Sequence, residues 1–442
     1  MRRNWQMKWL KNRNGVRKMD TNVNSNKGGF GKGFLAGVVL SLLIVLVGFC
    51  FANPFANKKA TAKTMDIVVK DNKDTEEEKE ADNDHIVNAE LLAKMQALES
   101  TIDKYFYLDR KTNDELRDGI YKGMMSALGD PYTEYYSKEE LVEIENSISG
   151  IYYGIGAQVN LDTETQLPKI SGVIENTPAE EAGLHVDDLI YKVDGKEIYG
   201  MSLTEAVTLI RGEEGTQVML TIIRDGEKDV LEIPVTRRKV VNPTAKGKML
   251  EDQIGYIQIT EFDAVTSDQF ETELNKLKGE GMEKLIIDLR GNPGGSLEAV
   301  LGVARQILPK GLVVYMEYKD GTRKDYECDG EHPLNMPLVV LVNGNSASAS
   351  EVLSGAIQDH GVGTLVGTTT YGKGIVQQMI DFKDGTAVKI TICGYCTPNG
   401  RDIHGVGIEP DVVCEFDSDA YYDEENPVDN QLEKAKEILK DE

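Results

Sequence analysis

The stretch from residue 338 to residue 377 constrains the fold of this chain more than any other. It opens with five consecutive apolar residues, Leu338–Val342, which end in an Asn-Gly turn signal, and a short bounded run of this kind predicts a buried β-strand. Apolar residues then recur at helical spacing. Ser346, Ser348 and Ser350 therefore crowd a strand-to-helix junction, where unpaired backbone N–H groups lie beside an exposed hydroxyl.

A lysine between two glycines, Lys373, follows Ser348 by twenty-five residues, and the two form a candidate catalytic pair. Each half also has a simpler interpretation. Ser348 and Glu351 have the spacing of a helix capping box, which involves no chemistry. Residues 367–374 nearly match a phosphate-binding loop, but Gly374 replaces the magnesium-binding hydroxyl and a strand-like sequence follows. We therefore set phosphate binding aside.

The N-terminal part of the chain predicts a membrane anchor. Residues 1–32 contain nine Lys and Arg against one Asp, although the whole chain has a net charge of −25. Residues 33–52 are uncharged and mostly apolar, which is about the length of a membrane-spanning helix. The basic segment is expected to stay in the cytoplasm and the rest of the chain to lie outside the cell membrane. The alternative is a cleaved signal peptide, because Cys50-Phe51-Ala52 resembles a cleavage site.

An acidic linker and a helical segment follow the predicted anchor. Residues 53–85 are polar and acidic, as is typical of a solvated, disordered tether. Residues 86–148 contain three stretches of helical spacing, which begin at Ile86, Asn113 and Lys138. We interpret these amphipathic helices as structural.

Residues 149–240 have a different pattern, with short β-rich runs separated by one short and one longer helix. This pattern resembles a PDZ domain. The matching motifs are Gly154-Ile155-Gly156-Ala157, Thr177-Pro178-Ala179-Glu180-Glu181-Ala182-Gly183-Leu184, Asp188-Leu189-Ile190 and Val193-Asp194-Gly195. The resemblance implies that Gly154, Ile155, Gly156 and Ala157 bind the C-terminal carboxylate of a peptide, because a glycine-rich turn can aim N–H groups at it while the next strand edge pairs with the peptide. Asp187 departs from the family, which usually has Gly there.

Residues 241–442 alternate strands with helices and end in an amphipathic helix, which predicts an α/β layer with its ligand site at the strand ends. Two such ends carry turns suited to chemistry, at residues 291–295 and 344–351.

Several other functions find no support in the sequence. The acidic charge argues against nucleic acid as a partner. Five cysteines give no disulfide framework, and Cys393 and Cys396 lie in a strand-like run where residues three apart face opposite sides. The five histidines show no ligand spacing, so we expect no metal and no cofactor. The chain lacks a G-x-S-x-G elbow, which disfavours a Ser-His-Asp hydrolase.

The motifs together resemble the carboxyl-terminal processing peptidases, which are tail-specific serine endopeptidases with an internal PDZ domain. The resemblance covers about residues 90–440 and rests on the order and spacing of separate motifs. Besides the PDZ motifs, these are residues 128–131, 288–295, 346–351, 371–374 with Gln377, and 395–400. The resemblance implies that Ser348 is the nucleophile, Lys373 the general base and Gln377 the residue that orients the lysine. Cys396 and Asn399 depart from the family, which often has Tyr and Ser there.

The chemistry of a lysine base adds further expectations. Because only about one free lysine in 2500 is neutral at pH 7, Lys373 must be buried, and no carboxylate should lie against it. In the strand expected after Gly372, Lys373 and Gln377 share one face. The oxyanion hole is expected to combine the N–H of Ala349 with that of Gly294 or Gly295.

The expected protein is a mixed α+β, multidomain, membrane-anchored serine endopeptidase of the extracytoplasmic side. Its parts are a transmembrane helix, a helical segment, a PDZ domain and an α/β peptidase core with a C-terminal helix. Its expected substrates are proteins or peptides with apolar C-terminal tails, and the resemblance implies a homodimer. Arg211, directly after the second PDZ helix, is expected to couple tail binding to the core. The alternative is a catalytically silent PDZ protein that only tethers tails.

Overall fold

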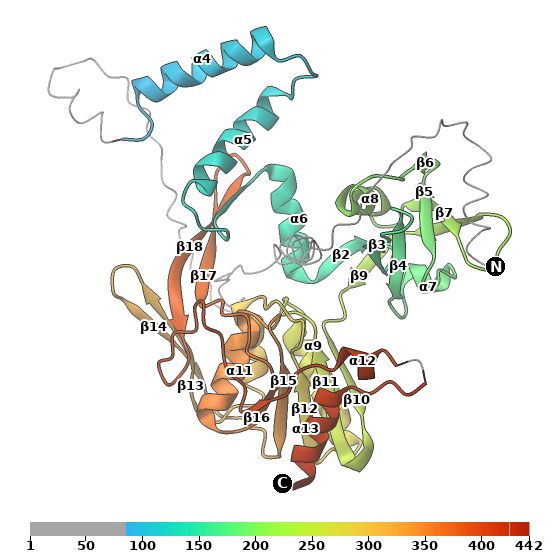
Figure 1. The fold of residues 1–442 in the computed structure, drawn as a ribbon, viewed down its shortest axis with the longest axis vertical. Helices are drawn as coiled ribbons and strands as arrows, with labels where there is room; N and C mark the ends of the chain where they lie inside the picture. The colour runs from blue at the N-terminus through green and yellow to red at the C-terminus, as the bar shows by residue number, and fades with distance from the viewer. Residues whose placement is uncertain (1–84, 424, 442) are drawn as a thin grey trace, which may run out of the picture. The chain divides into compact units, whose positions relative to one another are not determined.

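The computed structural model of this protein describes residues 85–423 and 425–441 (Figure 1). The basic segment 1–32, the predicted membrane helix 33–52 and all but the last residue of the acidic linker lie outside the described residues. Within the described part of the chain, no helix combines the length and the apolar composition needed to cross a membrane.

Three helices begin the described chain, and each begins with a side-chain cap. They are α4 (Ala89–Tyr105), α5 (Asn113–Ser126) and α6 (Lys138–Ser149). Thr112 and Ser137 form capping boxes with Glu115 and Glu140, which explains why α5 and α6 begin where they do. The prediction of three helices in this segment is confirmed.

The segment between residues 151 and 241 is a β-rich unit with its own core. Its sheet has the strand order β3-β4-β5-β7-β8, with β6 paired to β5. The elements are β3 (Ala157–Leu161), β4 (Pro168–Val173), α7 (Pro178–Glu181), β5 (Leu189–Val193), β6 (Lys196–Glu197), α8 (Leu203–Ile210), β7 (Gln217–Ile223) and β8 (Leu231–Thr236). The chain enters through β2 (Ile151–Gly154) and leaves through β9 (Arg238–Val241), and these two strands pair antiparallel. The unit is therefore an insertion in the chain.

The C-terminal part of the chain is built on a six-stranded sheet with the order β10-β11-β12-β15-β16-β19. Neighbouring strands from β11 to β19 are parallel, and β10 pairs antiparallel with β11. The strands are β10 (Ala245–Met249), β11 (Ile254–Ile259), β12 (Lys284–Asp288), β15 (Leu338–Val342), β16 (Thr364–Gly367) and β19 (Val412–Val413). The helices are η1 (Glu251–Gln253), α9 (Thr266–Gly279), α10 (Leu297–Ala304), α11 (Ala349–His360), α12 (Ser418–Tyr421) and α13 (Asn430–Asp441).

Both faces of this sheet are covered, so its central strands are apolar throughout. Ile287 and Val340 belong to the core cluster that includes side chains of α9, α10 and α11. The alternate residues Ile286 and Val339 pack in a second cluster with Ala435 of α13.

A second, antiparallel sheet has the order β1-β18-β13-β14, with β17 also paired to β18. Its strands are β1 (Glu134–Tyr136), β13 (Gly311–Tyr318), β14 (Arg323–Cys328), β17 (Ile375–Asp381) and β18 (Ala387–Cys396). Through β1, which lies between α5 and α6, the N-terminal segment joins this sheet. An ion pair from Lys389 Nζ to Glu134 Oε2, 2.8 Å long, reinforces the junction.

Candidate active site

The candidate active site lies where the neighbouring parallel strands β12 and β15 end. Hydrogen bonds join the two loops that follow these strands. The Gly291 N–H donates to Asn343 Oδ1, and the Ala347 N–H donates to the Asn292 carbonyl, each at 3.0 Å. The two turns that the sequence singled out are therefore held together at one edge of the sheet.

Ser348 has a strained backbone at the start of α11. Its φ is +56° and its ψ is −112°, whereas an ordinary N-cap residue is extended. Such dihedral angles persist in a non-glycine residue only where the surroundings hold them. Glu351 Oε2 accepts a hydrogen bond from the Ser348 N–H at 2.7 Å, and the Tyr395 hydroxyl donates to the Ser348 carbonyl at 3.0 Å. The hydrogen bond from the Ser348 N–H to the Glu351 side chain, which is one of the two bonds of the predicted capping box, is thus present. It helps to keep Ser348 in its strained conformation.

The glycines predicted for the oxyanion hole lie against this serine. A Cβ on Gly294 would be 2.8 Å from Ser348 Cβ and 2.9 Å from the Ala349 nitrogen, and a Cβ on Gly295 would be 1.9 Å from the Phe262 carbonyl oxygen. Only glycine fits at either position. The Gly294 N–H, however, donates to the Asn292 side chain at 2.8 Å, so in this structure the preferred second donor is engaged elsewhere.

Glu351 also holds the turn that carries Lys373. Its buried carboxylate accepts hydrogen bonds from the Lys373 N–H at 2.9 Å, the Gly372 N–H at 2.7 Å and the Thr370 hydroxyl at 2.6 Å. One side chain thereby fixes the backbones of both members of the candidate catalytic pair. The capping-box spacing was the only sequence signal of Glu351, and it did not indicate this second contact.

Burial lowers the pKa of Lys373 from the ordinary 10.5 to about 8. The side chain is only 6% exposed, which confirms the prediction that it is buried. The charge of Lys389 lowers the pKa further, whereas the carboxylates of Asp130, Glu351 and Glu134 oppose the shift. Carboxylates therefore lie near enough to act on the lysine by charge, while the prediction that none lies against it stays a prediction. Burial is the largest of these effects, so the pKa stays below its ordinary value.

Gln377 is buried, but the predicted strand geometry around it is wrong. β17 begins at Ile375, so Lys373 precedes the strand, and a bulge after Val376 interrupts the alternation of side chains. Gln377 Nε2 donates to Thr391 Oγ1 of β18 at 3.0 Å. Gln377 Oε1 is buried and has no hydrogen-bond partner among the described residues.

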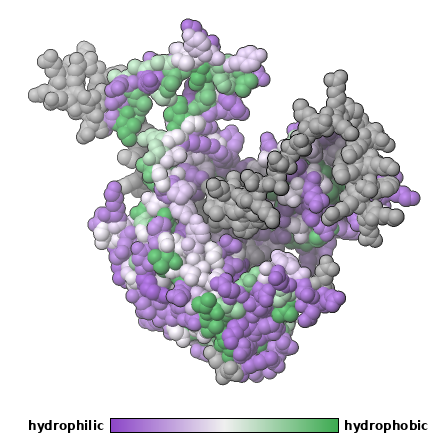
Figure 2. Space-filling view, in the orientation of Figure 1, coloured by the Kyte–Doolittle hydropathy of each residue, from purple (hydrophilic) through white to green (hydrophobic). Residues whose placement is uncertain are grey.

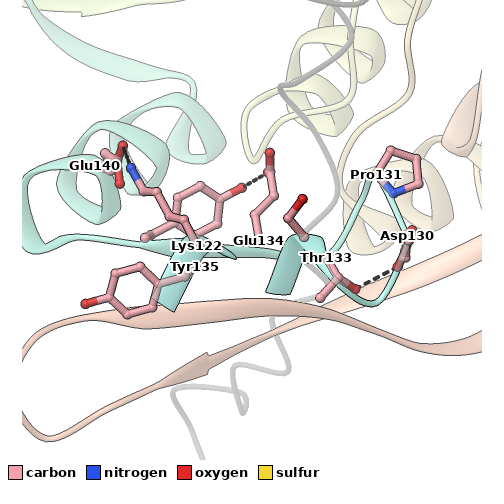
Figure 3. A pocket seen from close by; sticks show the side chains of 10 residues that line it. Lys122, Asp130, Pro131, Thr133, Glu134, Tyr135 and Glu140 are labelled. Atoms are coloured by element: carbon pink, nitrogen blue, oxygen red, sulfur yellow. Dashed lines mark hydrogen bonds and ion pairs between the residues drawn. The ribbon is translucent and has the colours of Figure 1, made fainter. Parts of the chain in front are cut away.

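The turn between α5 and β1 brings further side chains to this region, although its segment was interpreted as structural. Lys373 Nζ lies 4.3 Å from the centre of the Tyr132 ring. Asp130 Oδ2 accepts hydrogen bonds from Thr133 Oγ1 at 2.7 Å and from Thr391 Oγ1 at 2.6 Å. Figure 3 shows Asp130 and Thr133 joined in this turn, beside a cavity of about 510 Å³. In the sequence, the motif at residues 128–131 was the one feature that could have indicated this turn. It was interpreted only as the end of a helix and as part of the family resemblance, not as part of the site.

A narrow apolar pocket of about 20 Å³ lies beside Ser348. Its walls come from α10, α11, β13, β17 and β18, which explains why no local sequence pattern indicated it. The lining residues are Leu297, Val300, Val314, Met316, Ser348, Ala349, Val352, Val376 and Tyr395.

The turn predicted to bind a peptide carboxylate joins β2 to β3. Gly156 has a φ of +86°, and a Cβ there would lie 2.3 Å from Thr177 Cβ, so this position requires glycine. The Ile155 carbonyl accepts a hydrogen bond from the Ala179 N–H at 2.7 Å, which fixes the turn against α7. β3 stands at one end of the strand order, so its outer edge is suited to pairing with an added strand.

Arg211 packs on the strand that leads into this unit, because its guanidinium lies 5.3 Å from the centre of the Tyr152 ring of β2. Cys393 and Cys396 are buried free thiols. In the described ranges, no group of three or more His, Cys, Asp or Glu side chains is placed to hold a metal ion.

Comparison with known proteins gives matches along most of the chain. Residues 253–414 match peptidase family S41, residues 169–224 match the PDZ domain, and residues 45–140 match the N-terminal domain of the activating protease CtpB. The chain is 35% identical over 343 residues to the carboxyl-terminal-processing protease of Synechocystis sp., which covers 76% of this chain and 80% of that protein. It is 37% identical over 311 residues to the carboxy-terminal processing protease CtpA of Bacillus subtilis. That match covers 70% of this chain and 66% of the relative.

Among solved structures, the photosystem II D1 C-terminal processing protease is 28% identical, with a TM-score of 0.44, and the match covers 74% of this chain and 94% of that one. The family S41 match and the curated relatives define this protein as a serine endopeptidase, and the PDZ match places a PDZ domain within its chain. It belongs to the carboxyl-terminal processing protease family.

Proposed function

We propose that this protease cuts peptide bonds with Ser348 as the nucleophile, Lys373 as the general base and Gln377 as the residue that orients the lysine. The proposal rests mainly on Glu351, which hydrogen-bonds to both residues. Its Oε2 accepts from the N–H groups of Ser348 and Lys373 at 2.7 Å and 2.9 Å. A buried lysine with a pKa of about 8 is half neutral at pH 8, as a base must be.

In the proposed reaction, neutral Lys373 takes the hydroxyl proton of Ser348 while Oγ bonds to the scissile carbonyl carbon. The carbonyl oxygen becomes an oxyanion, which the Ala349 N–H and the N–H of Gly294 or Gly295 stabilise. Gly294 can act only after its N–H leaves Asn292, so substrate binding would reorganise this turn. The lysine ammonium then protonates the leaving amine as the C–N bond breaks. Water hydrolyses the acyl ester by the same steps.

The pocket beside Ser348 is proposed to receive the side chain on the acyl side of the scissile bond. Its walls are apolar and its volume is about 20 Å³, which favours a small apolar residue such as alanine. A charged residue there would lose its hydration without gaining a partner.

The PDZ domain is proposed to bind the apolar C-terminal tail of a substrate, with the turn 154–157 holding its carboxylate and the edge of β3 pairing with its backbone. Arg211 is proposed to couple this binding to the core, because it packs on Tyr152 of β2, the strand that connects the two. Cleavage of peptides with and without an apolar C-terminus should differ in the wild type and become equal in Arg211→Ala. A normal difference in that variant would refute the coupling.

We further propose that residues 33–52 anchor the enzyme in the cell membrane, with the catalytic part on the extracytoplasmic side. A protease added to intact cells should degrade the catalytic part, and deletion of residues 1–52 should release it. Protection of the catalytic part in intact cells would contradict this orientation.

The helical segment is proposed to form a homodimer. α4 and α5 have no buried residues, and Figure 2 shows hydrophobic side chains gathered over them. Leu92, Phe106 and Leu108 are 56%, 54% and 69% exposed, and a second copy of this chain would cover such surface. Light scattering of the protein without residues 1–52 should give a dimer mass, and a monomer mass would contradict this proposal.

The catalytic roles are tested by Ser348→Ala and Lys373→Ala. Both variants should keep the wild-type unfolding midpoint and lose all cleavage of unfolded, apolar-tailed substrates. A serine-reactive probe should label the wild type at Ser348. Cleavage that persists in both variants would refute the mechanism, and a wild type that binds tails without cleaving them or reacting with the probe would favour the silent tether.

A further inference from the structure

The hydrogen bonds around Gln377 form a chain with a fixed direction. Thr391 Oγ1 donates to Asp130 Oδ2 at 2.6 Å, and Gln377 Nε2 donates to Thr391 Oγ1 at 3.0 Å. A hydroxyl has a single proton, and an ionised carboxylate only accepts. The proton of Thr391 is therefore committed to Asp130, and only its lone pairs remain for the glutamine.

This direction decides which way the Gln377 amide faces. Because Thr391 can only accept, the NH₂ group of Gln377 must point at it, and the carbonyl Oε1 is directed elsewhere. Gln377 as a whole is 1% exposed, its Oε1 is buried, and no described residue donates a hydrogen bond to that oxygen. The two orientations of an amide have nearly the same shape, so packing alone would not select one.

Asp130 remains an acceptor because it stays ionised. Partial burial raises its pKa, but hydrogen bonds from the Thr133 and Thr391 hydroxyls and the Tyr132 N–H, together with the charge of Lys373, outweigh burial and leave the pKa below its ordinary value. The same turn also places the Tyr132 ring 4.3 Å from Lys373 Nζ. Asp130 thus belongs to the surroundings of the proposed base.

We infer that Asp130 and Thr391 are positioning residues, which fix the Gln377 amide so that Oε1, and not the NH₂ group, is available to accept a hydrogen bond from Lys373. The inference rests on the proposed roles of Lys373 and Gln377. An ammonium group only donates, so it can bond to Oε1 but not to the NH₂ group that a flipped amide would present. The turn between α5 and β1 thereby makes the N-terminal segment a part of the catalytic centre.

The decisive experiment is a double-mutant cycle on the full chain in detergent. Thr391→Val removes the hydroxyl at nearly constant shape and should lower kcat about 10- to 100-fold with little change in KM, whereas Thr391→Ser should recover most of the rate. In a Gln377→Ala background, Thr391→Val should cause no further loss, because both changes remove the same contact. Unchanged kcat in Thr391→Val, or losses that multiply in the double variant, would overturn the inference.

A second measurement does not depend on the Thr391 variants folding. The charged groups that face Lys373 are Asp130, Lys389 of β18, Glu134 of β1 and Glu351 of α11. Asp130→Asn removes a charge that raises the lysine pKa, so the acid limb of kcat/KM should move to lower pH. An effect of charge alone would move this limb and leave the kcat of the alkaline plateau unchanged. The inference also requires a lower plateau kcat, and a wild-type plateau would overturn it. Failure of the proposed mechanism is distinguishable, because it would appear as activity in Lys373→Ala.

Discussion

Replacing Lys389 with methionine would test how charge around Lys373 sets the rate. Lys389 pairs with Glu134 at 2.8 Å, and its charge lowers the pKa of Lys373. Lys389→Met removes this repulsion and leaves the Glu134 carboxylate without its partner. Both changes favour the protonated form of Lys373, so its pKa should rise above about 8.

The size of the effect follows from the fraction of neutral lysine. With a pKa of about 8, about one molecule in ten has a neutral Lys373 at pH 7, compared with about one in 3000 at the ordinary pKa of 10.5. Burial and the charge of Lys389 together enlarge the reactive fraction about 300-fold, which corresponds to about 3 kcal/mol. Each pH unit by which the variant's pKa rises should lower kcat/KM at pH 7 about tenfold and leave the alkaline plateau unchanged.

The assay is kcat/KM on a peptide substrate at constant ionic strength, from mildly acidic to alkaline pH. The wild-type curve should be half-maximal near pH 8, and the Lys389→Met curve should lie at higher pH. Lys278→Met, at an exposed position on α9, is the matched control and should follow the wild type. A wild-type curve that is flat through pH 8, or a Lys389→Met curve displaced to lower pH, would refute this account of Lys373.

Three other changes test the geometry of the site and core. Gly294→Ala should lower kcat at least about 100-fold, because its Cβ would lie 2.8 Å from that of the proposed nucleophile at a φ of +104°; Gly279→Ala, with nothing within 4 Å, is its control, and equal rates would contradict the prediction. Met316→Ala enlarges the apolar pocket, so a peptide series should show cleavage after larger apolar residues, and an unchanged order would show that the pocket does not bind this side chain. Arg290→Met leaves the buried Asp288 without its guanidinium partner at 2.6 Å and should lower the free energy of unfolding in urea by about 3–5 kcal/mol. A loss below about 1 kcal/mol would mean that this pair contributes as little as an exposed one.

Hydrophobic periodicity was sufficient to predict the regular elements. The predicted strand Leu338–Val342 agrees with the structure at both ends. There, the run of apolar residues and the turn residues that follow it indicate the same boundary. The PDZ and peptidase family were likewise predictable, because their motifs are local and occur in order.

The surroundings of Lys373 were not predictable in the same way. A bulge after Val376 has no periodic signature, so the strand expected to carry both the lysine and Gln377 begins only at Ile375. The contact of Asp130 with Thr391 joins residues 261 positions apart, and no local pattern records such a pairing. The membrane anchor, the homodimer and the roles of the site residues stay predictions.

The shared carboxylate of Glu351 has a consequence for latency. Its four hydrogen bonds include the N–H groups of Ser348 and Lys373, both on Oε2. A displacement of the lysine turn also weakens the hold on a serine whose backbone is strained at a φ of +56°, and that strain favours its departure. In the proposed mechanism, nucleophile and base would then be displaced together. A movement confined to the lysine turn would therefore lower activity without anything covering Ser348.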